Sequence, residues 1–283
     1  MPICLDCSKF IDHNCSAYIQ ASQILGREIP PPPLGGCEIP IVENYLPFIQ
    51  EGMNVLEIGC GSWSLIKDYC QTVGASYEGI DSLFEYFGKK TVATRIENLA
   101  DLSFPDNFFD LVIGNQTMEH WAENGCTLKW GLFQCFRTCK YSGRVLMNVP
   151  IHFHGTREFM LGDLEKICSL LTPFSGNVAI ENWGYPYAPI PSLFPHPGYW
   201  KLHKKPAYVL DIQAIKDRPL PQGYSNRGAS YGRLAQLLNY PLSYNIYRIL
   251  RRIGLFTQDY AFSAPIKADI TRKSGKSNIN SLI

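Results

Sequence analysis

The sequence predicts an α/β protein in which helices cover both faces of a mostly parallel sheet. Apolar runs that end in glycine or at a turn, such as 53–59 and 108–115, have the length of buried strands. Helical patterns lie between these runs, at 64–74 and 120–140, and this alternation is typical of parallel sheets. With 283 residues, the chain can form one large core with a smaller appendage.

Each element follows from a local pattern. Short apolar runs predict strands, and apolar residues three or four positions apart predict helices. Up to residue 150 the expected elements are helix 41–49, strand 53–59, helix 64–74, strands 75–81, 87–98 and 108–115, helix 120–140 and strand 143–150. Beyond it they are helix 162–171, strand 177–184, a helix over 233–253 that Pro241 interrupts, and a strand within 259–270.

A proline run marks one boundary. Pro30–Pro33 are followed by two glycines, a stiff stretch and then a flexible one. We therefore expect a Cys-rich N-terminal segment and Pro-rich linker over 1–38, and the main domain over 39–283.

The composition and the first residues indicate the cellular compartment. The first residues lack the basic and apolar regions of a secretory signal, and no run of eighteen apolar residues occurs, so we expect a cytoplasmic protein. The ten cysteines are then expected to be mostly reduced, as small buried side chains. Residues 200–283 hold fourteen Lys and Arg against four Asp and no Glu, which favours an anionic partner near that region or a solvated basic face.

The strongest local signal is a glycine-rich turn after the strand 53–59. Gly59 and Gly61 allow unusual backbone angles and leave room for a ligand against the main chain. A dinucleotide-binding turn would have glycine at position 64, where this chain has serine. The acidic Glu57 suits a ligand with a cationic amino group. Asp81 ends the next predicted strand, where a carboxylate can accept hydrogen bonds from two ribose hydroxyls.

Four motifs in order resemble the class I S-adenosylmethionine-dependent methyltransferases. They are VLEIGCG at 55–61, GID at 79–81, LSFPDNFFDLV at 102–112 and MEH at 118–120. The resemblance spans about residues 53–150 and implies a Rossmann-like, seven-stranded, mostly parallel sheet, with S-adenosylmethionine as the cofactor. It also implies that 177–184 and 259–270 are strands six and seven, separated by an insertion over 185–255 that covers the substrate.

The resemblance also implies which residues bind the cofactor. Glu57, Gly59 and Gly61 would hold its methionine end, and Asp81 its ribose, with Ser82 next to it. The loop at Asn98 and Leu99 would contact adenine, although the family typically has Asp at the first of these positions. Asn115 would lie beside the amino-acid part of the cofactor.

Three histidines are candidates for a general base. His120 follows one predicted strand, and His152 and His154 follow the next, so all three belong to the carboxyl edge of the sheet. In an extended chain His152 and His154 point the same way, as a base and its positioner, or as two metal ligands beside a carboxylate such as Glu119 or Asp163. A hydroxyl acceptor needs such a base, which makes O-methylation the leading prediction.

The acceptor is expected to be a small molecule or a carbohydrate. Residues 185–200 contain five prolines and five aromatic residues beside lysines, a combination that suits a sugar or an acidic glycan, or forms a lid over the core. The basic and apolar segment 247–256 is compatible with peripheral membrane contact. N- or C-methylation of a small metabolite is one alternative. A noncatalytic nucleic-acid-binding protein is another, and only then would nucleic acid be the partner. The oligomeric state stays open.

The N-terminal segment contains a candidate zinc site. Cys4, Cys7, His13 and Cys15 are thiol and imidazole ligands of the kind that tetrahedral zinc prefers, and Cys37 could replace the histidine. All four lie within twelve residues, which is shorter than common zinc-finger spacings. Structural zinc and free thiols therefore both remain open.

Overall fold

A computed structural model of the protein describes residues 3–4, 16–28, 41–86, 88–150, 164–184, 201–203, 208–227 and 261–263. The predicted boundary near residue 38, the predicted loop 185–200 and the predicted helix over 233–253 lie outside these ranges.

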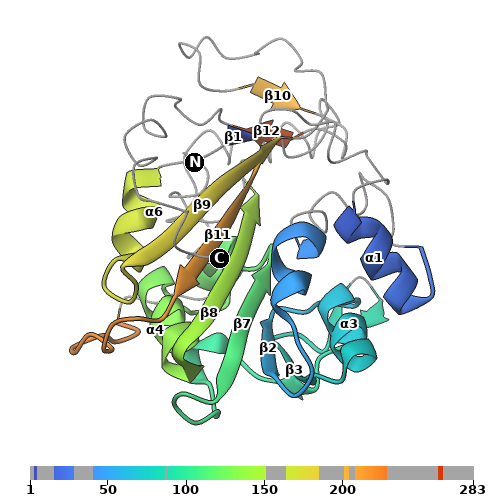
Figure 1. Ribbon diagram of the computed structural model, residues 1–283. Helices are drawn as coiled ribbons and strands as arrows, with labels where there is room; N and C mark the ends of the chain where they lie inside the picture. Colours follow the sequence, from blue (N-terminus) through green and yellow to red (C-terminus); the bar gives the residue numbers. More distant parts are fainter. Residues whose placement is uncertain are drawn as a thin grey trace.

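The predicted fold class is confirmed. The main sheet has eight strands in the order β1-β9-β11-β8-β7-β2-β3-β6, with helices on both faces (Figure 1). The bounds of its strands are β1 Ile3–Cys4, β2 Asn54–Ile58, β3 Ser76–Asp81, β6 Arg95–Ile96, β7 Phe109–Asn115, β8 Cys139–Pro150, β9 Asn177–Gly184 and β11 Tyr208–Ile215. Among these, β11 pairs antiparallel with both β8 and β9, and the other neighbouring pairs are parallel. Six of the strands, β2, β3, β6, β7, β8 and β9, fall on strands that the sequence predicts, while β11 and the two-residue edge strand β1 beside β9 were not predicted.

The remaining elements are short. The helices are α1 Ser16–Leu25, α3 Leu65–Val73, α4 Leu128–Thr138 and α6 Leu164–Leu171, with the helical turns η2 Ile41–Tyr45, η3 Leu46–Phe48, η4 Leu99–Asp101 and η5 Met118–Glu123. Two small antiparallel sheets pair β4 Glu85–Tyr86 with β5 Lys89–Lys90, and β10 Lys201–His203 with β12 Ala261–Ser263.

One predicted strand was wrong. Within 259–270, the described residues Ala261–Ser263 pair with β10 and not with the main sheet. The antiparallel strand that completes the sheet is β11, at 208–215. The segment between β9 and β11 is therefore 185–207, shorter than the insertion predicted over 185–255.

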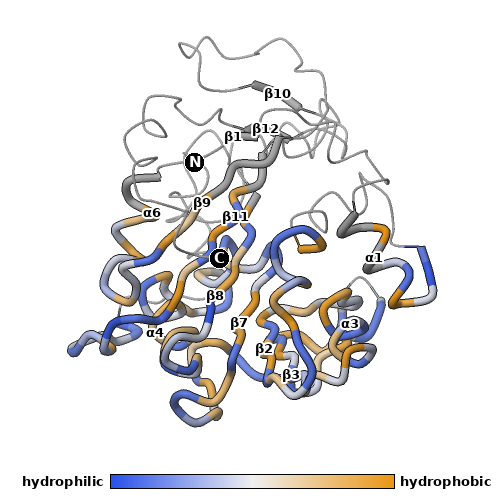
Figure 2. The backbone as a smooth tube through the Cα atoms, viewed as in Figure 1, coloured by the Kyte–Doolittle hydropathy of each residue, from blue (hydrophilic) through white to orange (hydrophobic). Residues whose placement is uncertain are grey.

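Strand alternation divides the core into two layers. In β7, Val112 packs with the cluster that includes α4 and α6, whereas Leu111 and Ile113 pack with the cluster that includes α3 and η2. Figure 2 shows the apolar colour of β7 at the centre of the fold. Burying both faces explains why this strand is a nearly continuous apolar run in the sequence.

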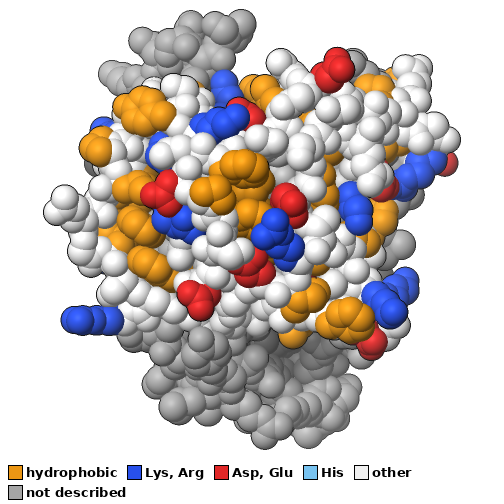
Figure 3. Space-filling model, turned by 90° about the horizontal axis from the view of Figure 1, so that it is seen from below, with side chains coloured by type: hydrophobic (Ala, Val, Ile, Leu, Met, Phe, Trp, Pro, Cys, Tyr) orange, Lys and Arg blue, Asp and Glu red, His pale blue; other side chains and the backbone are white. Residues whose placement is uncertain are grey.

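Charged side chains of both signs are spread over one face of the molecule. Figure 3, seen from below the view of Figure 1, shows Lys and Arg interspersed with Asp and Glu and with small apolar areas. Arg137 pairs with Asp106 at 2.7 Å and Lys140 with Asp110 at 2.7 Å. On the described part of this face, positive charge is therefore not gathered into one area.

Candidate active site

The turn between β2 and α3 forms one wall of a cavity. Gly59 and Gly61 have φ angles of +69° and +60°, which favour glycine. A Cβ atom on Gly59 would lie 2.7 Å from the Cβ atom of Thr117, so the chain is tightly packed there. A Cβ atom on Gly61 would have no neighbour within 4 Å, because this residue lines open space.

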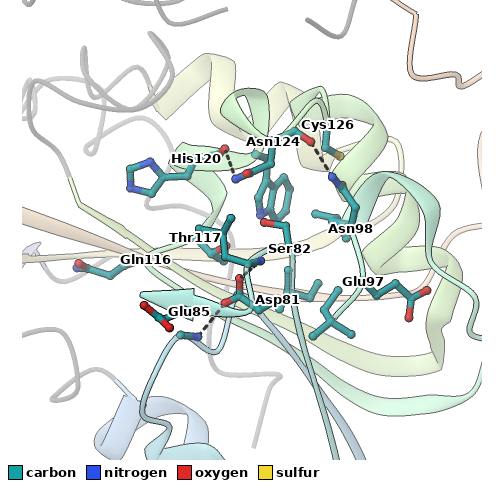
Figure 4. A pocket seen from close by; sticks show the side chains of 17 residues that line it. Asp81, Ser82, Glu85, Glu97, Asn98, Gln116, Thr117, His120, Asn124 and Cys126 are labelled. Carbon is teal, nitrogen blue, oxygen red and sulfur yellow. Dashed lines mark hydrogen bonds between the residues drawn. The ribbon is translucent and has the colours of Figure 1, made fainter. Parts of the chain in front are cut away.

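Asp81 at the end of β3 joins the turn to the next strand. Its side chain is 3% exposed; one carboxylate oxygen accepts a hydrogen bond from the Gly61 N–H at 3.0 Å, and the other from the Leu83 N–H at 2.9 Å. Figure 4 shows the carboxylate at the cavity wall, with these two hydrogen bonds. The backbone thereby fixes the carboxylate in place, and each oxygen keeps a lone pair that can accept a second hydrogen bond.

The cavity has a volume of about 620 Å³, the size of a site for a small organic molecule. It brings together seven of the predicted residues: Gly59, Gly61, Asp81, Ser82, Asn98, Leu99 and His120. It also includes ten residues that the sequence analysis did not assign to the site: Ile58, Ile80, Leu83, Glu85, Glu97, Gln116, Thr117, Trp121, Asn124 and Cys126. Most of these residues are close in sequence to predicted residues, and this proximity was the only sign in the sequence that they belong to the site.

Glu57 does not line the cavity. Its buried carboxylate accepts hydrogen bonds from the Tyr77 hydroxyl at 2.7 Å and from the Ser64 hydroxyl. Ser64 in turn accepts a hydrogen bond from Lys67 N–H and so caps α3. Burial raises the pKa of Glu57 to about 7, although the hydrogen bonds from Ser64 and Tyr77 lower it. In this structure Glu57 holds the start of α3 against β3.

Asn115 does not line the cavity either. It ends β7, opposite Asn148 of β8, and its side-chain oxygen is buried without a hydrogen-bond partner in the described part of the chain. The next residue, Gln116, does line the cavity and has a φ angle of +50°, which is strained for a residue other than glycine. Its N–H donates to the carbonyl oxygen of Asn148 at 2.9 Å.

Asn98 lines the cavity, but protein atoms hold its amide. The side-chain oxygen accepts a hydrogen bond from Ala100 N–H at 2.8 Å, and the nitrogen donates to the carbonyl oxygen of Asn124 at 2.7 Å. These bonds start the turn η4 and join it to the segment after η5. Asn98 therefore shapes this wall of the cavity.

His120 lies on η5 and its side chain is 36% exposed. Its Nε2 atom is 3.8 Å from a carboxylate oxygen of Glu119, which is 1% exposed. Figure 4 shows His120 and Gln116 toward one end of the cavity, and Asn98, Glu97 and Cys126 toward the other. His152 and His154 lie outside the described residues.

No cluster of three or more His, Cys, Asp or Glu side chains suited to a metal ion occurs among the described residues. Of the predicted zinc ligands only Cys4 falls in a described segment, β1, while Cys7, His13 and Cys15 lie outside the description. None of the helices in the described ranges is long and apolar enough to span a membrane.

The cavity has features that suit a nucleoside. Gly61 leaves open space at the turn, and the fixed carboxylate of Asp81 can accept hydrogen bonds from a sugar. The buried side chains of Leu99 and Trp121 supply apolar surface for a flat base. Cys60 in the glycine turn is 4% exposed, and burial raises the pKa of its thiol to about 12, which favours the neutral thiol at neutral pH.

Comparisons with known proteins assign the family. Residues 39–255 match a protein family described as a methyltransferase domain, which is more than half of the chain. A search of curated proteins found no match.

Three solved structures illustrate the similarity. The YcgJ protein of Bacillus subtilis shares 15% identity, with 61% of this chain and 94% of that chain covered and a TM-score of 0.45. A methyltransferase described as S-adenosylmethionine-dependent, from Archaeoglobus fulgidus, shares 20% identity, with 62% and 91% covered and a TM-score of 0.42. Phosphoethanolamine N-methyltransferase 2 of Haemonchus contortus, in complex with phosphomonomethylethanolamine and S-adenosylhomocysteine, shares 18% identity, with 64% and 47% covered and a TM-score of 0.41.

The family match agrees with the order of the four sequence motifs and with the sheet that carries them. The chain belongs to the methyltransferase domain family and is an enzyme, a class I S-adenosylmethionine-dependent methyltransferase.

Proposed function

We propose that the enzyme methylates a hydroxyl oxygen of a small or sugar-like acceptor, with a histidine as general base. The cofactor supplies a methyl group on a positively charged sulfur. The protein's own residues must then hold the acceptor in line, exclude water and remove the hydroxyl proton.

The position of His120 supports this proposal most directly. The imidazole lies in the wall of the cavity that contains Asp81, and it is exposed enough to meet a substrate. A ring that accepts a proton becomes an imidazolium, and the buried carboxylate of Glu119, 3.8 Å away, stabilises that charge. Glu119 would therefore act as a positioning residue for a base at His120.

His152 and His154 remain the other candidates for the base. They follow β8 by two and four residues, and β8 ends at the same edge of the sheet as β2 and β7. The three histidines are therefore tested separately.

The charge of the cavity favours a neutral acceptor. Its described lining contains the carboxylates of Asp81, Glu85 and Glu97 and the imidazole of His120, but no Lys or Arg. A cationic cofactor gains from this field, whereas an anionic acceptor would be repelled. An acidic acceptor therefore depends on cations from the basic C-terminal region, most of which lies outside the described residues.

The deciding experiment is to incubate the purified protein with methyl-labelled S-adenosylmethionine and fractionated cell extract, and to identify the labelled product. We expect a methyl ether on a small or carbohydrate molecule. Single substitutions of His120, His152 and His154 by Gln should then show one variant with turnover reduced at least a hundredfold at neutral pH, a typical contribution of a general base. Its affinity for S-adenosylhomocysteine should stay unchanged.

Two results would contradict the proposal. A labelled nitrogen or carbon atom in the product would replace it with N- or C-methylation. Retention of full turnover by all three variants across pH would exclude a histidine base.

Two further proposals concern a zinc site and the cellular location. Structural zinc bound by Cys4, Cys7, His13 and Cys15 predicts about one zinc per chain by elemental analysis, and its loss on substitution of Cys4 and Cys7 by Ser. The predicted cytoplasmic location is tested by fractionation of the source cells.

A further inference from the structure

Trp121 leaves a hydrogen-bond donor unused in the wall of the cavity. The residue is 3% exposed, and its indole N–H is buried without a hydrogen-bond partner in the described part of the chain. A buried donor without a partner is unfavourable, and such groups are rare in folded proteins. Trp121, which carries this donor, is one of the residues that line the cavity.

The packing of helix α4 orients the indole. A Cβ atom on Gly131 would lie 2.7 Å from the Cζ3 atom of Trp121, so the glycine makes room for the six-membered ring. The nitrogen is on the opposite edge of an indole from the Cε3 and Cζ3 atoms. The N–H edge of Trp121 is therefore turned away from α4.

The neighbouring wall suits a nucleobase. Leu99 and Cys126 are 6% and 1% exposed and also line the cavity. Burial raises the pKa of the Cys126 thiol to about 12, so this side chain is neutral and contributes apolar surface. Adenine is the flat aromatic part of the cofactor, and its ring nitrogens carry in-plane lone pairs that accept hydrogen bonds. The amide of Asn98, in contrast, is already bonded to Ala100 and Asn124.

We infer that the indole N–H of Trp121 donates a hydrogen bond to a ring nitrogen of the cofactor's adenine, and so contributes to selection of that base. This inference rests on the cofactor of the family and not on the identity of the acceptor. The partner is adenine N1, N3 or N7, the three ring nitrogens with a free lone pair in the nucleoside.

Trp130 offers a matched control on the adjacent helix. Its indole N–H donates to the carbonyl oxygen of Ala100 at 2.7 Å, and Trp130 does not line the cavity. Substitution of either tryptophan by Phe removes the donor and keeps an aromatic ring. In Trp130→Phe this breaks a bond within the protein, whereas in Trp121→Phe it removes a donor that the ligand-free protein does not use.

The experiment measures S-adenosylhomocysteine binding by calorimetry and the melting temperature of the ligand-free full chain. We expect Trp121→Phe to bind about tenfold more weakly, with an unchanged or higher melting temperature. Trp130→Phe should melt at a lower temperature and bind within about twofold of the wild type. The 1-deaza, 3-deaza and 7-deaza analogues of S-adenosylhomocysteine then identify the nitrogen, because one of them should bind equally to the wild type and to Trp121→Phe.

Three results would overturn the inference. Unchanged S-adenosylhomocysteine affinity of Trp121→Phe would show that the donor does not meet the cofactor. If Trp121→Phe weakens the binding of all three deaza analogues as much as it weakens the binding of S-adenosylhomocysteine, the donor does not meet a ring nitrogen. If the folded wild type does not bind S-adenosylhomocysteine, the cofactor assignment itself is wrong. This failure is distinguishable from failure of the Trp121 inference, because it is seen without either substitution.

Discussion

Substitution of Gly61 by Ala tests the glycine turn as a ligand wall. The φ angle of +60° at Gly61 disfavours a side chain by about 1–2 kcal/mol, which is the expected loss of folding stability. The added Cβ atom would meet no protein atom within 4 Å, because it would occupy cavity space. We therefore expect a folded variant with S-adenosylhomocysteine affinity reduced about tenfold or more.

Gly59→Ala is the matched comparison in the same turn. Its φ angle of +69° gives a similar strain, but here the Cβ atom would also press on the side chain of Thr117, at 2.7 Å from its Cβ atom. Strain of about 1–2 kcal/mol and overpacking of about 1–3 kcal/mol together predict a loss of about 2–5 kcal/mol.

Urea unfolding and calorimetry separate the two effects. Gly61→Ala should lose mainly affinity, and Gly59→Ala mainly stability. The reasoning fails if Gly61→Ala binds S-adenosylhomocysteine as the wild type does, or if Gly59→Ala is as stable as the wild type.

Two other predictions concern carboxyl groups. Asp81→Asn keeps the shape of the side chain but loses one acceptor and the charge. Calorimetry should therefore show S-adenosylhomocysteine binding weaker by about 1.5–3 kcal/mol, roughly 10- to 100-fold. Unchanged affinity would show that Asp81 does not bind the ribose. Glu57 has a pKa of about 7 in the folded protein against 4.5 ordinarily, so its contribution to stability is most favourable below about pH 4.5 and is lost as the pH rises to about 7. The unfolding free energy of Glu57→Gln minus that of the wild type should therefore rise by about 3 kcal/mol when the pH is raised from about 4 to about 8, as measured by urea unfolding. A difference that does not change with pH would contradict this.

The sequence predicted the central strands well because their physical signals are local. The apolar runs around Val55 and Val112 are buried on both faces, and the glycine turn and Asp81 directly follow strands. The carboxyl ends of parallel strands meet at one edge, so strand order places the glycine turn and Asp81 together, whereas Asn98 and Leu99 were assigned from the family resemblance.

The strand that completes the sheet was missed although its signal was present. Residues 208–215 alternate in character: Leu210, Ile212 and Ala214 pack in the core, while Asp211 is held on the other face by Asn44, whose amide donates to it at 2.6 Å. This period of two predicts a strand. The proline-rich and basic residues around it, together with an expected long insertion, drew the prediction to 259–270.

The side of the sheet that Glu57 faces could also have been predicted, because side chains alternate between the two faces along a strand. Leu56 and Ile58 face one core cluster, so Glu57 between them must face the other side of the sheet, where Ser64 and Tyr77 bind it. The hydrogen-bond partners of Asn98 and the unused donor of Trp121 depend on contacts distant in sequence, and no local pattern indicated them.

The most direct test of the account is calorimetric titration of the folded full chain with S-adenosylhomocysteine, with NAD⁺ as a dinucleotide control. We predict saturable binding of S-adenosylhomocysteine at one site per chain, weakened by Asp81→Asn, and no heat with the dinucleotide. A well-folded protein that binds no S-adenosylhomocysteine, or that binds the dinucleotide in its place, would contradict the account.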